Sequence, residues 1–305
     1  MPEVKEIRKF ADFIKKKIKN KKIIEINILN GRYKKHAPFV NYNLLIQQLP
    51  LKVIDVKTKG KFLYIILSKN LYLFNTLGLS GGWCYQKNNS NNFEFSDTLD
   101  EYTNYLPEQS ISNYLTNAIN HLNVEFKTNY GSLYFYDVLS FGTLKIVDDE
   151  KHLNKKLNEI GPDIMDDNTD LFLFKNQILN YRNLNKEIGI VLLNQKVISG
   201  IGNYLRSEIL YISKINPFTQ VSQLTNLEIK KIYNNSKIAT WGDYDKKKAL
   251  ELNIINKRTK FPSDFNRMFF VYNQKKDIYN NNVIKKELYE GSKKRFIYYV
   301  PEIQL

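Results

Sequence analysis

The 305-residue chain carries 46 lysines and arginines against 31 acidic residues, a net charge of +15, and 43% of its residues are hydrophobic. It is long enough for two folded domains, and its charge is typical of a protein that binds a polyanion. No apolar run approaches the ~20 residues of a transmembrane helix. A single cysteine, Cys84, excludes a disulfide framework and a cysteine-based zinc site. We expect a soluble intracellular protein with no membrane partner, metal or cofactor.

The first six residues, Met1–Glu6, suggest covalent chemistry if Met1 is removed. Pro2 would then carry a free secondary amine, which can attack a sugar C1′ and form a cationic iminium that accepts electrons. Glu3 could carry protons to and from the sugar, and Glu6 lies one helical turn further on. Proline is also common in the first turn of a helix, so this interpretation depends on the rest of the chain.

An amphipathic helix is predicted over residues 3–19, followed by short strands rich in β-branched and aromatic residues between about 23 and 147. Many short strands without intervening helices favour a β-sandwich. A polar insertion at about 87–120 should form a loop and a short helix. The apolar stripe of the first helix is Val4, Ile7, Ala11, Ile14 and Ile18.

Two glycine-containing segments of the strand region are candidates for ligand contact. In Lys59–Leu63, Lys61 follows a glycine at the start of a strand, where it could bind a phosphate or assist Pro2. In Leu77–Gly82, a tight loop could bring the apolar tip Leu79 close to a ligand. Each segment taken by itself is also compatible with an ordinary turn.

A charged stretch at 148–156 is predicted to be a linker, and the pattern after it is helical. A buried helix should end at Gly200-Ile201-Gly202, and Asn203 should cap the next helix. The exposed N–H groups there would form an anion site. Thr225–Glu228 is a capping box that starts a further helix.

The last segment, residues 264–305, is predicted to be a β-hairpin. Its strands are expected at Met268–Tyr272 and Phe296–Val300, with turns at 280–282 and 290–292. The basic run Lys293–Arg295 would suit the backbone of a nucleic acid, although it would equally suit a solvated turn.

Three of these segments, in this order, resemble the formamidopyrimidine/endonuclease VIII family of DNA glycosylases, most closely its eukaryotic and viral endonuclease VIII-like branch. Gly200–Leu210 resembles the family's helix–two-turn–helix motif, Pro2–Ile7 its N-terminus and Lys59–Leu63 its strand lysine motif. Order and spacing agree for all three, so the resemblance spans essentially the whole chain.

Together, the patterns and the resemblance predict a two-domain α+β fold. An N-terminal helix and β-sandwich would occupy 1–147, a linker 148–156, and a helix–two-turn–helix domain 157–263. A β-hairpin at 264–305 would form a zincless finger.

The resemblance also implies roles for individual residues. Pro2 would be the nucleophile on C1′ of the damaged nucleotide, Glu3 the acid and base, and Glu6 a supporting carboxylate. The residues implied to bind DNA phosphates are Lys61, which would also assist catalysis, Asn203 and Arg295.

Two departures from the family pattern are informative. The family's zinc-binding cysteines fall approximately at Asp277, Asn280, Val300 and Ile303, so we expect the aromatic run Phe296–Tyr299 to replace the metal by packing. The family usually has arginine at the positions of Leu139 and Ser140, and the first of these contacts the orphaned base. Leu79 and Phe141 remain as void-filling side chains, so we predict weak discrimination of the opposite base.

The resulting hypothesis is a monomeric, bifunctional DNA glycosylase and AP lyase of base excision repair, with damaged DNA as its partner. The resemblance favours oxidised pyrimidines and hydantoins as substrates, a proline Schiff base, and β,δ-elimination. The alternatives are a non-catalytic DNA- or RNA-binding helix–two-turn–helix protein and a relative that has lost its chemistry. The pair Pro2-Glu3 argues against the first alternative, because a protein that only binds has no need of it, and the retained Glu3 and Lys61 argue against the second.

Overall fold

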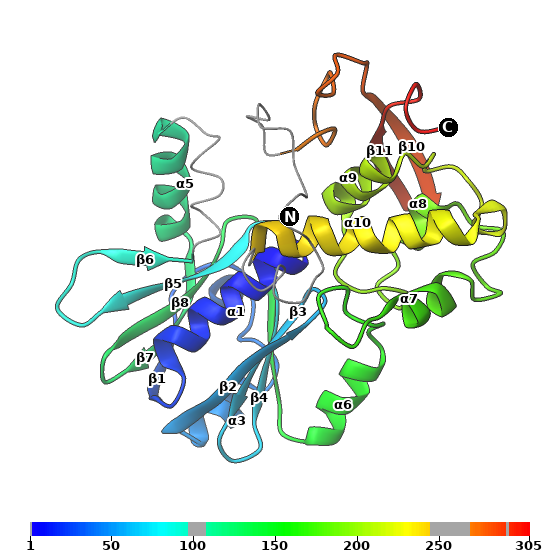
Figure 1. Cartoon of the computed structure of the whole chain (residues 1–305). Coiled ribbons are helices and arrows are strands. Elements are labelled where there is room, and N and C mark those ends of the chain that lie inside the picture. The colour runs from blue at the N-terminus through cyan, green and yellow to red at the C-terminus, as the bar shows by residue number, and fades with distance from the viewer. Residues whose placement is uncertain (1, 97–107, 245–268, 291–292) are drawn as a thin grey trace. The chain divides into compact units, whose positions relative to one another are not determined.

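The computed structural model describes residues 2–96, 108–244, 269–290 and 293–305 (Figure 1). The chain divides into two compact units. The first comprises Pro2 and Glu6–Asn158, and the second comprises Glu3–Lys5 and Glu159–Leu305. In the part of the chain that is described, no helix is both long and apolar enough to span a bilayer.

The N-terminal helix α1 spans Val4–Ile18, as the apolar stripe predicted. Its side chains at Ile7, Ile14 and Ile18 are buried in the core of the first unit. Val4 belongs instead to the core of the second unit. The first residue of α1 therefore contributes to a different core from Ile7, Ile14 and Ile18.

In the described part of the first unit, nine antiparallel strands are hydrogen-bonded in the order β6-β5-β8-β7-β1-β2-β3-β4-β9. Strands β1 and β2 pair only at Lys22↔Lys52 and Ile23↔Leu51, so the sheet folds there into two layers. The strands are β1 (Lys22–Ile28), β2 (Leu51–Lys59), β3 (Phe62–Leu67), β4 (Tyr72–Thr76), β5 (Gly81–Lys87), β6 (Phe93–Phe95), β7 (Leu122–Thr128), β8 (Gly131–Asp137) and β9 (Thr143–Val147).

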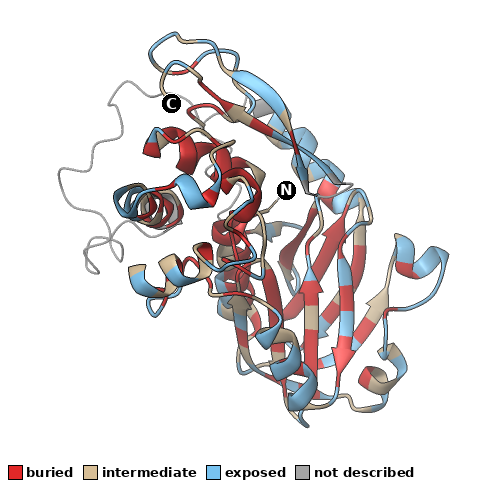
Figure 2. Cartoon of the chain, turned by 90° about the vertical axis from the view of Figure 1, so that its right-hand side faces the viewer, coloured by how far each residue is buried: buried red, intermediate tan, exposed pale blue. Residues whose placement is uncertain are grey.

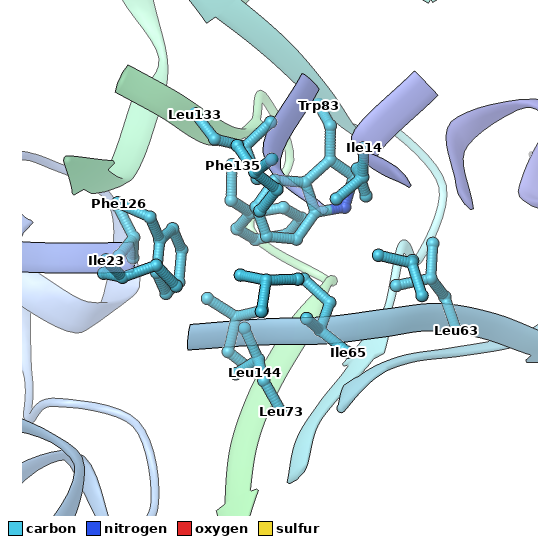
Figure 3. Packing of buried hydrophobic residues seen from close by; sticks show 14 of the residues in the cluster. Ile14, Ile23, Leu63, Ile65, Leu73, Trp83, Phe126, Leu133, Phe135 and Leu144 are labelled. Atoms are coloured by element: carbon cyan, nitrogen blue, oxygen red, sulfur yellow. The ribbon is translucent and has the colours of Figure 1, made fainter. Parts of the chain in front are cut away.

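The two layers enclose the core of the first unit, which confirms the predicted β-sandwich. Trp83 from β5 packs against Phe135 from β8, with ring centroids 5.2 Å apart. Figure 3 shows these rings gathered with Ile65 from β3 and Leu144 from β9. Along β2 and β9, buried and exposed residues alternate, as expected where one face of a sheet packs on a core, whereas β8 is buried throughout. Figure 2 shows both patterns along the strands.

In the described part of the first unit, four helices accompany α1: α2 (Arg32–Lys35), α3 (Tyr42–Gln47), α5 (Glu108–Asn120) and α6 (Glu150–Asn158). The described part of the polar insertion contains β6 and α5, and residues 97–107 lie outside the described part. Most of the segment expected to be a linker lies in α6. Buried Leu153 anchors this short helix, and Glu150 and Lys156 lie at the ends that suit their charges.

The second unit is built from α7 (Leu171–Ile178), α8 (Ile188–Val191), α9 (Asn203–Ser213), η1 (Val221–Gln223) and α10 (Asn226–Tyr244). The capping box that was predicted is present at the start of α10. Thr225 N–H donates to Glu228 Oε2 (2.8 Å), and Glu228 N–H donates to Thr225 Oγ1 (3.3 Å).

The prediction of a buried helix that ends at Gly200 was wrong in length, because the regular helix of this segment comprises only the four residues of α8. Beyond it, side chains bond to the backbone in place of helical partners. Asn194 Oδ1 accepts from Lys196 N–H (3.0 Å), and Gln195 binds both Gly200 N–H (3.0 Å) and Ile201 O (2.7 Å). Leu192, Val197 and Ile198 of this segment are buried, whereas Lys196 is exposed.

The C-terminal hairpin is present, but one of its strands was placed wrongly. Strand β10 (Ile284–Glu290) pairs with β11 (Lys293–Tyr299), in register from Ile284↔Tyr299 to Glu290↔Lys293. The described residues of the segment Met268–Tyr272, which we expected to form a strand, do not form one. Their N–H groups at Phe270, Val271 and Tyr272 donate to the Glu208 carboxylate at 2.8 to 3.0 Å, so they are unavailable for pairing.

Candidate active site

The carboxylate of Glu3 caps the N-terminus of helix α9. Its Oε2 accepts from Gly202 N–H (2.6 Å) and its Oε1 from Tyr204 N–H (3.0 Å), and the side chain is only 1% exposed. A helix N-terminus favours a negative group through its dipole and its unpaired N–H groups. The anion site predicted at these glycines therefore exists, but it holds a carboxylate of the chain itself.

A close backbone contact fixes Glu3 in this place. The next residue, Val4, donates its N–H to Gly200 O (3.2 Å). Gly200 has a φ of +106°, and a Cβ added there would lie 2.8 Å from Val4 Cβ. Only glycine fits both this conformation and this approach. The glycine-rich turn thus brings Glu3 to the helix end.

Asn203 is the first residue of α9 and not its cap, which corrects the prediction. The cap position is Gly202, which has no side chain to form a cap bond, and Glu3 binds the N–H groups of the helix end instead. Asn203 Oδ1 instead accepts from Arg206 Nη2 (3.2 Å), one helical turn further on. The Asn203 side chain is therefore oriented by a neighbour on its own helix.

Arg206 is a functional candidate that the sequence reasoning missed. It is fully buried, and it also donates to Gly189 O (2.8 Å) and Phe296 O (2.8 Å), which ties α9 to β11. Burial lowers the pKa of Arg206 to about 10, although the nearby Glu3 carboxylate acts in the opposite direction. The available signal was an arginine at position i+3 from Asn203, flanked by Leu205 and Ile209 of the same helix.

Tyr272 was also missed, because its segment was interpreted as a strand. Burial raises its pKa above the ordinary value, and the charges of Glu3 and Tyr298 add to this effect. Its ring packs against Tyr204 of α9 at a centroid distance of 6.1 Å. Tyr272 thus belongs to the surroundings of the Glu3 carboxylate.

The remaining site residues of the N-terminal part lie in the first unit. Pro2 is half-buried, and Glu6, in the first turn of α1, is only 2% exposed. Lys61 is half-buried in the tight turn between β2 and β3, one residue before the strand start where we expected it. The neighbouring Lys59 Nζ donates to Leu157 O (2.8 Å).

The expected DNA-contacting side chains are exposed. Leu79 is 48% exposed and Phe141 is 59% exposed, and both lie on loops of the first unit. Arg295 is exposed on β11 of the second unit, opposite Leu288 of β10.

Two family models match this chain. The N-terminal domain of formamidopyrimidine-DNA glycosylase matches residues 1–144, and the helix–two-turn–helix domain of the same enzyme matches residues 151–239. The chain belongs to the formamidopyrimidine-DNA glycosylase family. The chain is similar to the formamidopyrimidine-DNA glycosylase of Ureaplasma parvum, with 29% identity over 100% of both chains. It is also similar to that of Mycoplasma genitalium, with 28% identity over 77% of this chain and 72% of the relative.

Solved structures of the glycosylase family share this fold. The Lactococcus lactis enzyme bound to DNA containing an AP site superposes with a TM-score of 0.70, at 20% identity over 99% of both chains. A MutM structure with DNA containing carbocyclic 8-oxo-G superposes equally well, at 21% identity over 100% of both chains. At these identities, the likeness establishes the fold alone.

The C-terminal segment, expected to be a zincless finger, is held together by hydrogen bonds among its described residues. Among residues 2–96, 108–244, 269–290 and 293–305, no three His, Cys, Asp or Glu side chains are grouped to bind one ion. Asp277 instead accepts from Tyr279 N–H (2.9 Å), Asn281 N–H (2.8 Å) and Tyr211 OH (3.1 Å). The last bond joins the finger to α9.

Hydrogen bonds of Gln304 and an apolar cluster also stabilise the C-terminal segment. Gln304 Nε2 donates to Ile215 O (2.9 Å), and its Oε1 accepts from Val300 N–H (2.8 Å). Tyr211, Phe270 and Val300 pack in one buried cluster. Within the predicted aromatic run, Ile297 and Tyr299 are buried, but Phe296 is 37% exposed because alternate residues of β11 face solvent.

Proposed function

We propose that the chain is a bifunctional DNA glycosylase and AP lyase that excises oxidised bases through an N-terminal proline Schiff base. The observation that carries this proposal is the fixed position of Glu3, whose carboxylate is bound by the α9 backbone (2.6 Å to Gly202 N) directly after Pro2 in sequence. A protein that only binds DNA gains nothing from a nucleophile placed next to a positioned carboxylate.

In the proposed reaction, Met1 has been removed and the Pro2 nitrogen attacks C1′ of the damaged nucleotide. The glycosidic bond breaks and the base leaves with its electron pair, taking a proton from water. Glu3 accepts the proton that the Pro2 nitrogen loses and transfers it to the ring oxygen as the sugar opens to the iminium. Loss of a C2′ proton then expels the 3′ phosphate, and a second elimination expels the 5′ phosphate. Water hydrolyses the iminium and regenerates the amine.

Lys61, Asn203 and Arg295 are proposed to bind the DNA backbone around the lesion. Lys61 and Arg295 are cations, while Asn203 offers an amide that Arg206 orients (3.2 Å). Each ionic phosphate contact contributes about −0.9 to the slope of log K against log salt. Lys61→Gln and Arg295→Gln should each make this slope shallower by about 1, whereas Asn203→Ala should weaken binding without changing the slope.

The proposed substrates are oxidised bases, with oxidised pyrimidines and hydantoins preferred. The solved Lactococcus lactis structures include complexes with DNA containing Fapy-dG and with DNA containing an oxidised pyrimidine, which supports this class. The endonuclease VIII-like branch and the zincless finger stay predictions, and the named relatives are formamidopyrimidine-DNA glycosylases. The exposed tips Leu79 and Phe141 would fill the space left by the extruded nucleotide.

Borohydride trapping on DNA that contains an abasic site tests the proposal. Protein whose Met1 removal has been verified by mass spectrometry should become covalently linked to the DNA. A matched control with Gly-Ser inserted before Pro2 should bind the DNA but not be trapped, because its proline nitrogen is an amide. Tight DNA binding without trapping would identify the chain as a non-catalytic binding protein.

A further inference from the structure

Two loops of the first unit connect the same two layers of the β-sandwich. Residues 77–80 join β4 to β5, and residues 138–142 join β8 to β9. Strands β4 and β9 pair with each other in one layer, and β5 and β8 pair in the other. Both loops therefore cross between the same two strand pairs, in opposite chain directions.

The two loops are in direct backbone contact. Gly78 has a φ of +61°, and a Cβ added to it would lie 2.7 Å from both Phe141 C and Gly142 N. Real Cβ atoms do not approach backbone atoms this closely, so the contact requires glycine. Neither loop can move far without displacing the other.

The carboxylate of Asp137, at the end of β8, binds both loops at once. Its Oδ1 accepts from Ser80 Oγ (2.6 Å) and its Oδ2 from Gly142 N–H (2.6 Å), and Asp137 is only 1% exposed. Ser80 Oγ in turn accepts from Leu139 N–H (2.8 Å). Bonds to a buried carboxylate are among the stronger hydrogen bonds in proteins, so this network holds both loops in one conformation.

Three apolar side chains project from this bonded pair of loops. Leu79 is 48% exposed, Leu139 is 52% exposed and Phe141 is 59% exposed. Exposed apolar groups cost solvation free energy unless a partner covers them, and here they are held on a rigid base. Apolar side chains inserted between base pairs are a known way to hold a kinked duplex open.

We propose that Asp137 and Ser80 are positioning residues that hold Leu79, Leu139 and Phe141 as a single apolar wedge for the DNA stack. Leu139 is the member that meets the strand opposite the lesion. This inference rests on the proposed function and deepens it. A leucine has no hydrogen-bond donor or acceptor, so this wedge fills space without identifying the orphaned base. Excision rates should therefore be similar opposite all four bases.

Insertion of the wedge can be measured without any chemistry at Pro2. The probe is duplex DNA with a tetrahydrofuran abasic analogue and 2-aminopurine on the opposite strand, whose fluorescence changes when stacking is disturbed. At saturating protein, Asp137→Asn and Ser80→Ala should greatly reduce the fluorescence change, and Ser80→Thr should restore it. Because Asp137→Asn and Ser80→Ala lose the positioning of the wedge, their rate of excision at saturating DNA should fall about 10- to 100-fold, while the dissociation constant for DNA should change less.

Matched controls separate positioning from general stability. Ser68 Oγ accepts from Lys52 N–H (3.0 Å) in a different turn of the same unit, so Ser68→Ala removes a comparable bond away from the wedge. Ile54 is 42% exposed on β2, so Ile54→Ala is the control for Leu139→Ala. The controls should retain the wild-type signal. The Leu139→Arg variant should gain a preference for an opposite cytosine, whose N3 and O2 are adjacent acceptors.

The proposal is overturned if Asp137→Asn and Ser80→Ala melt earlier but keep the full fluorescence change. It is overturned equally if Leu139→Ala behaves like Ile54→Ala in excision and fluorescence, or if the wild-type enzyme strongly prefers one opposite base. Failure of borohydride trapping would contradict the proposed catalysis while leaving these binding signals intact. The two failures are therefore distinguishable.

Discussion

The Glu3 carboxylate accepts the backbone N–H of Gly202 at 2.6 Å, across 199 residues of sequence. This bond makes one side chain serve two purposes. It satisfies the N-terminus of α9, which has no other side-chain cap, and it fixes the carboxylate that follows Pro2. Folding of the second unit and the proposed proton transfer therefore depend on the same group.

Replacing Glu3 by glutamine should affect both properties. The amide presents a donor toward N–H groups and lacks the negative charge that the helix end favours, so the free energy of unfolding should fall by about 1–2 kcal/mol. Base excision should fall by about 10²- to 10⁴-fold, because an amide cannot transfer the proton. Urea unfolding and single-turnover excision on a lesion duplex measure the two effects.

Glu228→Gln is the matched control for this variant. Glu228 also binds an N-terminal backbone N–H of its helix, from Thr225 at 2.8 Å, but it lies in the exposed capping box of α10. The Glu228→Gln variant should be slightly less stable than the wild type and should excise the base at the wild-type rate. Wild-type excision by a folded Glu3→Gln enzyme would exclude Glu3 as the proton carrier.

A second prediction concerns the pair Asn203 and Arg206. Arg206→Lys keeps the charge but cannot reach Gly189 O, Phe296 O and Asn203 Oδ1 together, so Asn203 should lose its fixed orientation. DNA binding should weaken by about the same factor in Arg206→Lys, Asn203→Ala and the double variant, because the residues act in series. Titrations of a lesion duplex measure the three affinities. Additive losses would show that Arg206 acts independently of Asn203.

Much of the fold was predictable because it depends on local patterns. The apolar stripe of α1 and the capping box of α10 are set by residues within a few positions of one another. The strands of the sandwich likewise follow from β-branched and aromatic composition. The resemblance of the glycine turn at 200–202 to a known motif then identified the family.

The features that were missed depend on contacts between distant residues. Glu208 binds the N–H groups of Phe270 to Tyr272, 62 to 64 residues away, and so removes a segment from the hairpin that its composition favoured. The capping of α9 by Glu3 displaced Asn203 from the role that propensity assigns it. No local signal in the sequence specifies either contact.

A third prediction concerns Cys84, the single cysteine of the chain. It is fully buried in β5, and burial raises the pKa of its thiol above the ordinary value. The thiolate is the reactive form, so the native protein should resist a maleimide at pH values near the ~8.5 at which free cysteine titrates. The urea-unfolded chain should be labelled once, as counted by mass spectrometry. Rapid labelling of the native protein would contradict the described packing of β5.

The last prediction concerns the C-terminal segment, where we propose that hydrogen bonds to Asp277 take the place of a metal cross-link. Asp277→Ala removes the acceptor for Tyr211 OH and for the N–H groups of Tyr279 and Asn281, so unfolding should become easier by about 2 kcal/mol. Calorimetry of the wild type and of Asp277→Ala, with and without EDTA, measures the change in unfolding free energy and any contribution of a metal. Asp166→Ala is the control, because Asp166 makes a similar but exposed turn with Asn168 and should change stability little. A fall in the wild-type melting temperature with EDTA would instead show that a metal stabilises the finger.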